Sequence, residues 1–201
     1  MNWQRAIQGF RSYLQLERSL SPNTVESYLR DVEQLRSFSE SLEYQSPIDL
    51  NIDMLREFVQ NVAEIGLSAT TQSRMVSGIR SFYRYLLLED KIEVDPSSLL
   101  QTPKIGRKLP DILSREEIEL MIDSVNLSLS EGERNRAILE TLYGSGLRVS
   151  ELTNLKISNI YFNEGFIRIA GKGDKERLVP LGGISAKRIS TYIKDVRVHL
   201  D

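Results

Sequence analysis

The chain has 201 residues, of which 40% are hydrophobic and 27% charged, a composition typical of a packed globular protein of one or two domains. It contains no cysteine and a single histidine, His199, which excludes disulfides and thiolate catalysis and leaves little for a zinc site or a catalytic triad. No stretch approaches the roughly 20 apolar residues of a membrane span, and the N-terminus does not resemble a signal peptide. We therefore expect a cytoplasmic protein that uses no metal, no cofactor and no membrane.

The net charge is weakly acidic, −2, but the charged residues are unevenly distributed. Residues 66–88 contain three arginines and no acid, and residues 134–197 contain 12 basic and 6 acidic residues. The acids are concentrated in 26–64 and 111–133. Because an anionic partner would meet local faces of the protein, the net charge does not exclude a nucleic acid.

The first ninety residues predict four amphipathic helices with short connections, an arrangement typical of a compact bundle. Ser21 before Pro22 and Ser68 are expected N-caps, and Gly66 is an expected C-terminal stop. The helices are expected over 3–18, from 22 to about 42, over 52–65 and over 68–88.

Residues 96–110 interrupt the helical pattern with three prolines and a glycine, which predicts an extended linker between domains 1–95 and 111–201. Its basic residues are Lys104, Arg107 and Lys108. Beyond it, Ser114 and Glu117 have the spacing of a capping box. The expected elements are helices over 114–124, 133–143 and 148–155, strands over 160–162, 166–169 and 178–179, and a last helix from about 185.

One face of the fourth predicted helix is basic and carries small hydroxyl side chains. Ser73, Ser77, Arg80 and Arg84 follow one another at helical spacing, with Arg74 beside them. Arginines and small hydroxyls without acids suit phosphate oxygens and base edges in a major groove. The alternative is an ordinary solvated face, although such faces usually contain interspersed acids.

Two further cations stand beside glycines. Arg148, which follows 144–146 (Gly-Ser-Gly), is expected in the first turn of its helix, where exposed amides and a guanidinium would together bind an anion. Glu151 could orient this arginine, or the two could form a surface ion pair of little energetic value. Lys172 lies between two glycines at the tip of a predicted hairpin and could reach a neighbouring groove, or it could be a solvated turn lysine.

These motifs carry a family resemblance. The segments GSGLRVSEL (144–152) and IAGKGDKERLVP (169–180) together resemble the first half of the catalytic domain of the tyrosine recombinase (phage integrase) family, nearest to its bacterial Xer-type members. The segment LSPNTVESYLRD (20–31) is similar to the opening of that family's core-binding domain. The resemblance covers nearly the whole chain.

The resemblance implies a mainly α fold with a small antiparallel β-sheet, made of an N-terminal four-helix core-binding (SAM-like) domain and the first half of an α+β catalytic domain. It implies a site-specific recombinase that breaks and rejoins DNA through a 3′-phosphotyrosine without metal. Arg148 matches the first catalytic arginine, Lys172 the hairpin lysine that protonates the departing 5′ oxygen, and Glu151 the acid that supports the site. The implied partners are double-stranded DNA with a specific recombination site and, in a full-length protein, other recombinase protomers.

We also expect DNA contacts from polar and basic residues of both domains and of the linker. The candidates are Asn23, Thr24, Tyr28, Arg30, Thr71, Ser73, Arg74, Ser77, Arg80, Arg84, Lys104, Arg107, Lys108, Lys175 and Arg177.

The sequence departs from the family in one respect. The family's second block, His-x-x-Arg followed by His or Trp and the nucleophilic Tyr, has no counterpart in residues 1–201. We therefore expect these residues alone to bind DNA without cleaving it. The family normally pairs protomers by donating a C-terminal helix, which residues 1–201 lack, so we also expect them to be monomeric. The alternatives are a natural non-cutting DNA-binding regulator, a truncated integrase of a mobile element, and an unrelated helical protein with a basic face.

Overall fold

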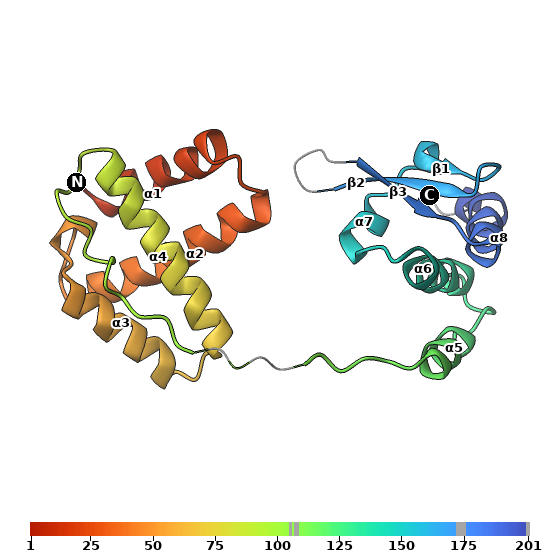
Figure 1. Ribbon diagram of the computed structural model, residues 1–201, viewed down its shortest axis with the longest axis horizontal. Helices are drawn as coiled ribbons and strands as arrows, with labels where there is room; N and C mark the ends of the chain where they lie inside the picture. Colours follow the sequence, from red (N-terminus) through yellow and green to blue (C-terminus); the bar gives the residue numbers. More distant parts are fainter. Residues whose placement is uncertain (105, 107–108, 172–175, 200–201) are drawn as a thin grey trace. The chain divides into compact units, whose positions relative to one another are not determined.

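The computed structural model describes residues 1–104, 106, 109–171 and 176–199 (Figure 1). The chain forms two compact units, Met1–Lys108 and Leu109–Asp201. No helix in these ranges combines the length with the apolar character that crossing a membrane requires.

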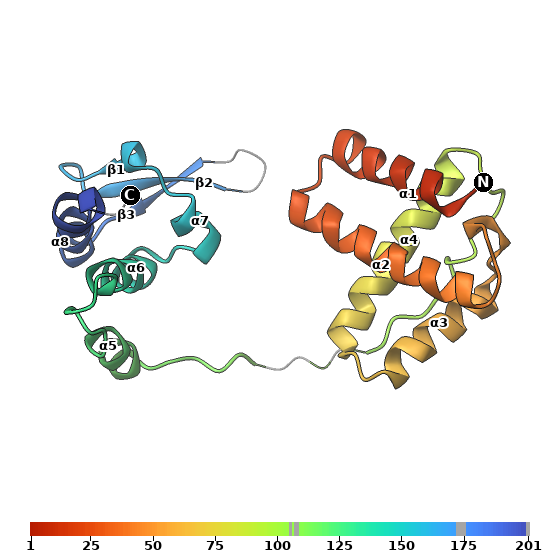
Figure 2. The same cartoon turned by 180° about the vertical axis from the view of Figure 1, so that it is seen from behind.

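The first unit is a bundle of four helices, and α2 crosses α4 within it (Figure 2). The side chains of Asn51 and Ser68 accept hydrogen bonds from the backbone at the starts of α3 and α4. Ser21 stands at the N-cap of α2, but its hydroxyl bonds the Thr24 hydroxyl at 2.9 Å rather than the backbone. The helices are α1 (Trp3–Ser12, continued by a π-helical turn, Tyr13–Glu17), α2 (Pro22–Ser41), α3 (Ile52–Glu64) and α4 (Ala69–Leu88).

Aromatic side chains of α1 and α4 form the centre of this unit's core. Phe82 is buried and lies edge-on to Phe10, with 5.3 Å between ring centroids, and nearly parallel to Trp3, at 6.0 Å. Tyr83 is also buried, and its hydroxyl donates to the Pro47 carbonyl at 2.9 Å. Since each fully buried large side chain contributes roughly 1.5–3 kcal/mol, this cluster holds α4 firmly in the bundle.

A buried ion pair joins α4 to α2. The Asp31 side chain has no exposed surface, and Arg74 Nη1 donates to its Oδ2 at 2.5 Å and to the Ser27 carbonyl at 3.3 Å. Gly78 leaves room for this carboxylate, because a Cβ there would come within 3.0 Å of Oδ2. Burial raises the pKa of Asp31, and the charge of Arg74 opposes that rise. The acid that residues 66–88 lack is thus supplied to Arg74 by a neighbouring helix.

The expected linker is partly packed onto the first unit. Ser97 and Leu100 are buried, and Leu100 belongs to the core of the bundle. Arg80 donates a hydrogen bond to the Leu100 carbonyl. The boundary between the two units falls after Lys108, inside the expected linker. Proline and glycine content predicted an extended segment from 96, but the apolar side chain of Leu100 fits the core, and the chain follows the bundle up to that residue.

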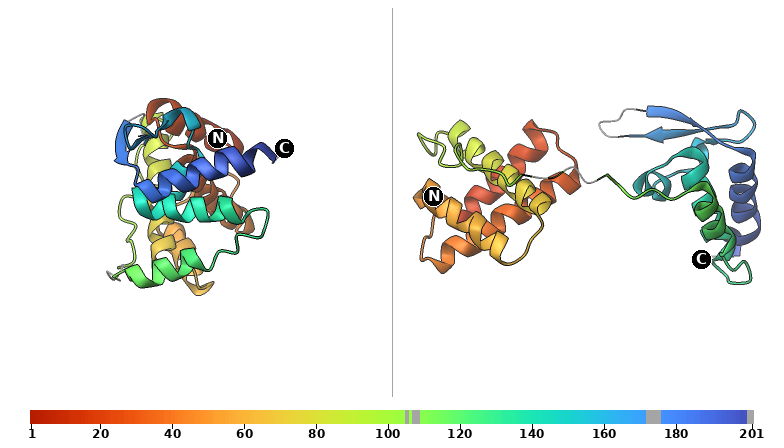
Figure 3. Two further views of the ribbon diagram at one scale, coloured as in Figure 1. Left: turned by 90° about the vertical axis from the view of Figure 1, so that its right-hand side faces the viewer. Right: turned by 60° about the horizontal axis from the view of Figure 1, so that its bottom comes forward.

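The second unit combines four helices with a three-stranded antiparallel sheet in the order β1-β2-β3. Ile167 and Ile169 of β2 are buried together with Ile189 of α8, and α8 runs alongside α6 (Figure 3). The elements are α5 (Arg115–Asp123), α6 (Gly132–Ser145), α7 (Val149–Thr153), β1 (Ile160–Tyr161), β2 (Phe166–Ala170), β3 (Glu176–Pro180) and α8 (Gly183–Thr191, continued by a π-helical turn, Tyr192–Val196, and a 3-10 turn, Arg197–His199). Short 3-10 helices at Pro47–Asp49 and Ile157–Asn159 complete the described elements.

The expected secondary structure of this unit agrees closely with the observed one. Ser114 and Glu117 form the predicted capping box at the start of α5. Strand β3 is longer than predicted, because Glu176 and Arg177 also pair with β2. Their charged side chains do not follow the apolar pattern from which the strand was predicted. The mainly α architecture with a small antiparallel sheet is the one expected from the sequence.

We predict that Arg74→Met lowers the free energy of unfolding at neutral pH by about 2–3 kcal/mol, because it leaves the Asp31 charge buried without its partner. This loss is smaller than the roughly 3–5 kcal/mol usual for a fully buried pair, because Arg74 is 39% exposed. Losing Arg74 raises the pKa of Asp31 further, so the variant should regain stability as the pH falls through that value and the carboxyl takes a proton.

Urea unfolding followed by circular dichroism at two pH values, near 7 and about one unit above the pKa of a free Asp, tests this prediction. Arg56→Met is the matched control, since Arg56 pairs with Asp53 on the exposed surface of α3. Equal losses at both pH values would show that Arg74 acts through packing rather than charge.

Candidate functional site

The turn between α6 and α7 places Arg148 at the surface of the second unit. Helix α6 continues through Gly144 and ends at Ser145, and its C-cap is Gly146, whose backbone is left-handed (φ 60°, ψ 39°). The chain then becomes extended at Arg148 (φ −75°, ψ 153°), which is the N-cap of α7 and not a residue of its first turn as expected. Gly146 thus makes the turn alone, and Arg148 stands at the junction with both its backbone N–H and its side chain near the first turn of α7.

The carboxylate of Glu151 receives four hydrogen bonds from two arginines. The backbone N–H of Arg148 donates to Oε2 at 2.8 Å, and its Nη1 donates to Oε1 at 2.9 Å. Arg177 of β3 donates from Nη1 to Oε1 at 2.6 Å and from Nη2 to Oε2 at 2.8 Å. One acidic side chain therefore joins the start of α7 to strand β3.

The three side chains of this cluster differ sharply in exposure. Glu151 is 7% exposed and Arg177 38%, whereas Arg148 is 76% exposed. The hydrogen bonds from Arg177, followed by that from the Arg148 backbone, lower the pKa of Glu151 to about 2. The carboxylate stays ionised at physiological pH, and Arg148 presents most of its guanidinium to solvent while one nitrogen is held. Such an arrangement can bind an anion with a fixed planar donor.

Strand alternation explains why Arg177 reaches Glu151. Arg177 pairs with Ile169, and Val179 pairs with Ile167, so these four side chains lie on one face of the sheet. Ile167 and Ile169 are buried, while Leu178, on the other face, is 62% exposed. Arg177 was predicted to contact DNA, and its contact with Glu151 was not predicted, although its position in phase with Val179 was a usable signal.

Lys172 and Lys175 lie outside the described residues, as do Arg107 and Lys108 of the expected linker. The described strands nevertheless define the base of the loop that contains Lys172. Ala170 pairs with Glu176, and the next residue, Arg177, contacts Glu151. The base of this loop is therefore fixed beside the Arg148 cluster.

The basic face of α4 is partly engaged within the first unit. Arg74 bonds Asp31, Arg80 bonds the Leu100 carbonyl, and the Ser77 hydroxyl donates to the Ser73 carbonyl. Arg84 is exposed and has no hydrogen-bond or ion-pair partner among the described residues. Arg80 is also exposed despite its hydrogen bond, so Arg80 and Arg84 are the arginines of this face that are open to a ligand.

The remaining candidates of the first unit differ in exposure. Asn23 and Arg30 of α2 and Lys104 are exposed. Thr24, Tyr28 and Thr71 are half-buried, and the hydroxyls of Thr24 and Thr71 bond Ser21 and Ser68 near the N-termini of α2 and α4. The structure thus places the α2 and α4 candidates on two contacting helices, and DNA contact by each of them stays a prediction.

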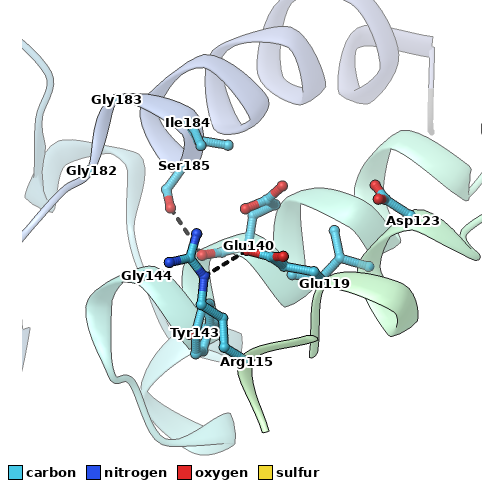
Figure 4. A pocket seen from close by; sticks show the side chains of 11 residues that line it. Arg115, Glu119, Asp123, Glu140, Tyr143, Gly144, Gly182, Gly183, Ile184 and Ser185 are labelled. Atoms are coloured by element: carbon cyan, nitrogen blue, oxygen red, sulfur yellow. Dashed lines mark hydrogen bonds and ion pairs between the residues drawn. The ribbon is translucent and has the colours of Figure 1, made fainter. Parts of the chain in front are cut away.

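A separate cavity of about 510 Å³ lies between α5, α6 and the start of α8 (Figure 4). Arg115 Nε donates to Glu119 at 2.8 Å, and the Ser185 hydroxyl donates to the Glu140 carbonyl at 2.9 Å. None of Arg148, Glu151 and Arg177 lines it. Because the carboxylates of Glu119, Asp123 and Glu140 line this cavity together with Arg115, the cavity is a poorer anion site than the Arg148 cluster. Among the described residues, no group of three His, Asp or Glu side chains is arranged to hold a metal ion.

Comparison with known sequences matches both units. Residues 7–90 match the phage integrase N-terminal SAM-like domain, and residues 111–199 match the phage integrase family. Tyrosine recombinase XerD of Staphylococcus aureus is 36% identical over 195 residues, and XerD of Staphylococcus epidermidis is 34% identical over 194. Each alignment covers 96% of this chain but only 66% of the relative, so the chain spans slightly less than two thirds of the length of these curated relatives.

Solved structures show the same fold. A lambda integrase dimer bound to a COC′ core site superposes with a TM-score of 0.72 at 16% identity, covering 96% of this chain and 69% of that one. A lambda integrase tetramer bound to a Holliday junction gives 0.72 at 16% identity, with coverage of 96% and 56%. The Tn1549 transposon integrase in complex with transposon right end DNA gives 0.70 at 18% identity, with coverage of 97% and 65%. By the sequence matches and the fold together, the chain belongs to the phage integrase family of tyrosine recombinases.

Proposed function

We propose that the protein is a site-specific DNA recombinase that breaks and rejoins strands through a 3′-phosphotyrosine, and that residues 1–201 supply its DNA-binding unit and the first half of its catalytic site. The observation that carries this proposal is the exposed guanidinium of Arg148, held by Glu151 at the start of α7. A fixed planar donor that faces outward is what binding a scissile phosphate requires.

Arg148 acts on the charge of the transition state. When a tyrosine oxygen that has given up its proton attacks the phosphorus, negative charge gathers on the non-bridging oxygens of a pentavalent phosphorane, and the guanidinium donates hydrogen bonds to them. Because Glu151 already holds the arginine, little reorganisation is needed as this charge develops. The bond to the 5′ oxygen then breaks, and that oxygen takes up a proton.

We assign this proton transfer to Lys172, as the resemblance implies. The pairing of Ala170 with Glu176 and the contact of Arg177 with Glu151 support the assignment, because they fix the base of the Lys172 loop beside Arg148. An ammonium group within hydrogen-bond reach of the leaving oxygen can act as a general acid. Rejoining reverses the step, with the 5′ oxygen attacking the phosphotyrosine and returning its proton.

The first unit supplies affinity for DNA. Arg80 and Arg84 are exposed on α4 beside Ser77, and residues 66–88 contain no acid that would repel phosphates. Contacts to phosphates position a protein on the duplex, whereas contacts to base edges select the sequence. The DNA-bound assemblies of lambda integrase support double-stranded DNA with a recombination site, and other protomers, as partners of the full-length protein. Residues 1–201 alone should bind as a monomer and should not cleave.

We predict that residues 1–201 bind duplex DNA with an affinity that falls steeply as salt rises, by a slope of about −0.9 per phosphate contact. Arg84→Ala should weaken binding and reduce that slope by about one, because it removes one phosphate contact. Gel shifts or fluorescence anisotropy over a salt series measure both effects. Arg56→Ala, which removes an arginine from the acid-containing helix α3, should change neither. Affinity that hardly changes with salt would contradict the proposed phosphate contacts.

We predict that Arg148→Lys, in the protein expressed from the complete gene, binds DNA normally but cleaves about 100–1,000-fold more slowly, the range reported for removing one transition-state donor. A lysine ammonium keeps the charge but cannot replace the planar fork. Single-turnover cleavage of a DNA site that traps the covalent complex measures the rate.

Arg115→Lys is the matched control for this variant. Arg115 is 75% exposed and pairs with Glu119, as the 76% exposed Arg148 pairs with Glu151, and it lies in the same unit. Normal cleavage by Arg148→Lys would remove Arg148 from the catalytic role. A wild-type protein that binds the site but forms no covalent complex would favour the non-cutting regulator.

A further inference from the structure

We propose that Arg177 is a positioning residue for DNA cleavage. By donating two hydrogen bonds to the Glu151 carboxylate, it orients Arg148 toward the scissile phosphate and connects the base of the β2–β3 hairpin to the start of α7. This inference rests on the proposed function and extends it to Arg177, a side chain predicted from the sequence to contact DNA.

The contact between Arg177 and Glu151 is a bidentate ion pair. Both terminal nitrogens of Arg177 donate to Glu151, one to each oxygen, at 2.6 and 2.8 Å. The same two oxygens accept from Arg148, one from its guanidinium and one from its backbone. Two parallel hydrogen bonds between planar groups fix the orientation of the carboxylate. The orientation of the Arg148 side chain therefore depends on Arg177, although Arg148 and Arg177 share only this acid.

The charges of the cluster also depend on Arg177. Glu151 alone would cancel the charge of Arg148 and weaken its attraction to a phosphate. With Arg177 present, two guanidinium groups surround one carboxylate, and the cluster keeps a net positive charge. The hydrogen bonds from Arg177 are also the largest cause of the lowered pKa of Glu151. Arg177 thus allows Glu151 to hold Arg148 in place without neutralising the site.

The same contact fixes the base of the loop that contains Lys172. Glu176, the neighbour of Arg177, pairs with Ala170 across the base of the loop. Glu151 therefore connects the strand that follows the loop with α7, whose N-cap is Arg148. A single side chain at the base of the hairpin can in this way set the spacing of two catalytic elements that come from different parts of the sequence.

A direct contact between Arg177 and DNA is the competing interpretation. Arg177 is 38% exposed, half as exposed as Arg148, and both of its terminal nitrogens are directed to Glu151. Arg177 lies on the sheet face that carries the buried Ile169. Arg168 lies on the other face, where it pairs with the exposed Leu178. The sheet face on which Arg177 lies and the hydrogen bonds of its two terminal nitrogens to Glu151 favour a role in positioning Arg148 over direct DNA binding.

The first test measures the pKa of Glu151 in residues 1–201 by NMR of carboxyl-labelled glutamate. The wild-type value should be about 2. Arg177→Met should raise it toward that of a free Glu, and by more than Arg148→Met does, because the hydrogen bonds from Arg177 lower this pKa more than the hydrogen bond from the Arg148 side chain, and both variants keep the bond from the Arg148 backbone. Arg168→Met, which removes an arginine from the other face of the same hairpin, should leave it unchanged. An unchanged Glu151 pKa in a folded Arg177→Met variant would overturn the proposal.

The second test uses the protein expressed from the complete gene at saturating DNA. Arg177→Met should slow single-turnover cleavage by about 100-fold, the cost of misplacing a catalytic group by about 1 Å, while DNA affinity stays within about threefold. Arg177→Lys should fall between Met and wild type, because it keeps the charge without the fork. It also serves as the readout if Arg177→Met does not fold. Arg168→Met is again the control.

The outcomes separate this inference from the proposed function. Normal cleavage with weakened binding in both Arg177 variants would make Arg177 a DNA contact and overturn the inference, while the recombinase function stands. A wild-type protein that does not cleave would overturn the proposed function and the cleavage role together, and the NMR titration would then still show whether Arg177 holds Glu151. Slow cleavage at normal affinity, with a raised Glu151 pKa, supports the inference.

Discussion

The sharing of the Glu151 carboxylate between two arginines is the interaction on which the site depends. The acid is almost fully buried against guanidinium groups, and its charge is satisfied by four hydrogen bonds from α7 and β3. A lone surface Arg148–Glu151 pair would contribute little. Arg177 changes this, because its two hydrogen bonds fix the carboxylate from strand β3 while Arg148 stays 76% exposed, as the proposed phosphate contact requires. Local sequence spacing supplied one half of this network, and the β-hairpin supplied the other.

Much of the fold could be predicted from the sequence because its signals are local. Helical periodicity, the Ser68 cap and the box of Ser114 and Glu117 each depend on residues a few positions apart, and all of them appear in the structure. Strand β3 and the end of the first unit were placed less well. In both cases the deciding contact is made by a distant segment: β2 pairs with the charged start of β3, and the helical bundle buries Leu100.

The candidate site shows the same limit. Arg148 and Glu151 were found as a pair because they are three residues apart, and the fold places them in contact. The partner of Glu151, Arg177, is 26 residues away, and no local rule points from one to the other. For Arg74 the sequence predicted an arginine open to DNA, because the helix that carries it contains no acid. Its partner, Asp31, comes from α2. Charge patterns along one segment therefore describe a surface only after the neighbouring elements are known.

Comparing the two arginine–carboxylate pairs shows how the same chemistry serves different purposes. The Asp31 side chain is wholly buried, Arg74 donates a hydrogen bond to it, and the pair joins α2 to α4. Glu151 is nearly as buried, yet its second arginine satisfies the acid, so Arg148 remains three-quarters exposed. A carboxylate with one arginine partner fixes structure, whereas a carboxylate with two can fix structure and still present a cation. We propose that Arg177 makes this difference: because it holds the Glu151 carboxylate from strand β3, the guanidinium of Arg148 stays open to an anion.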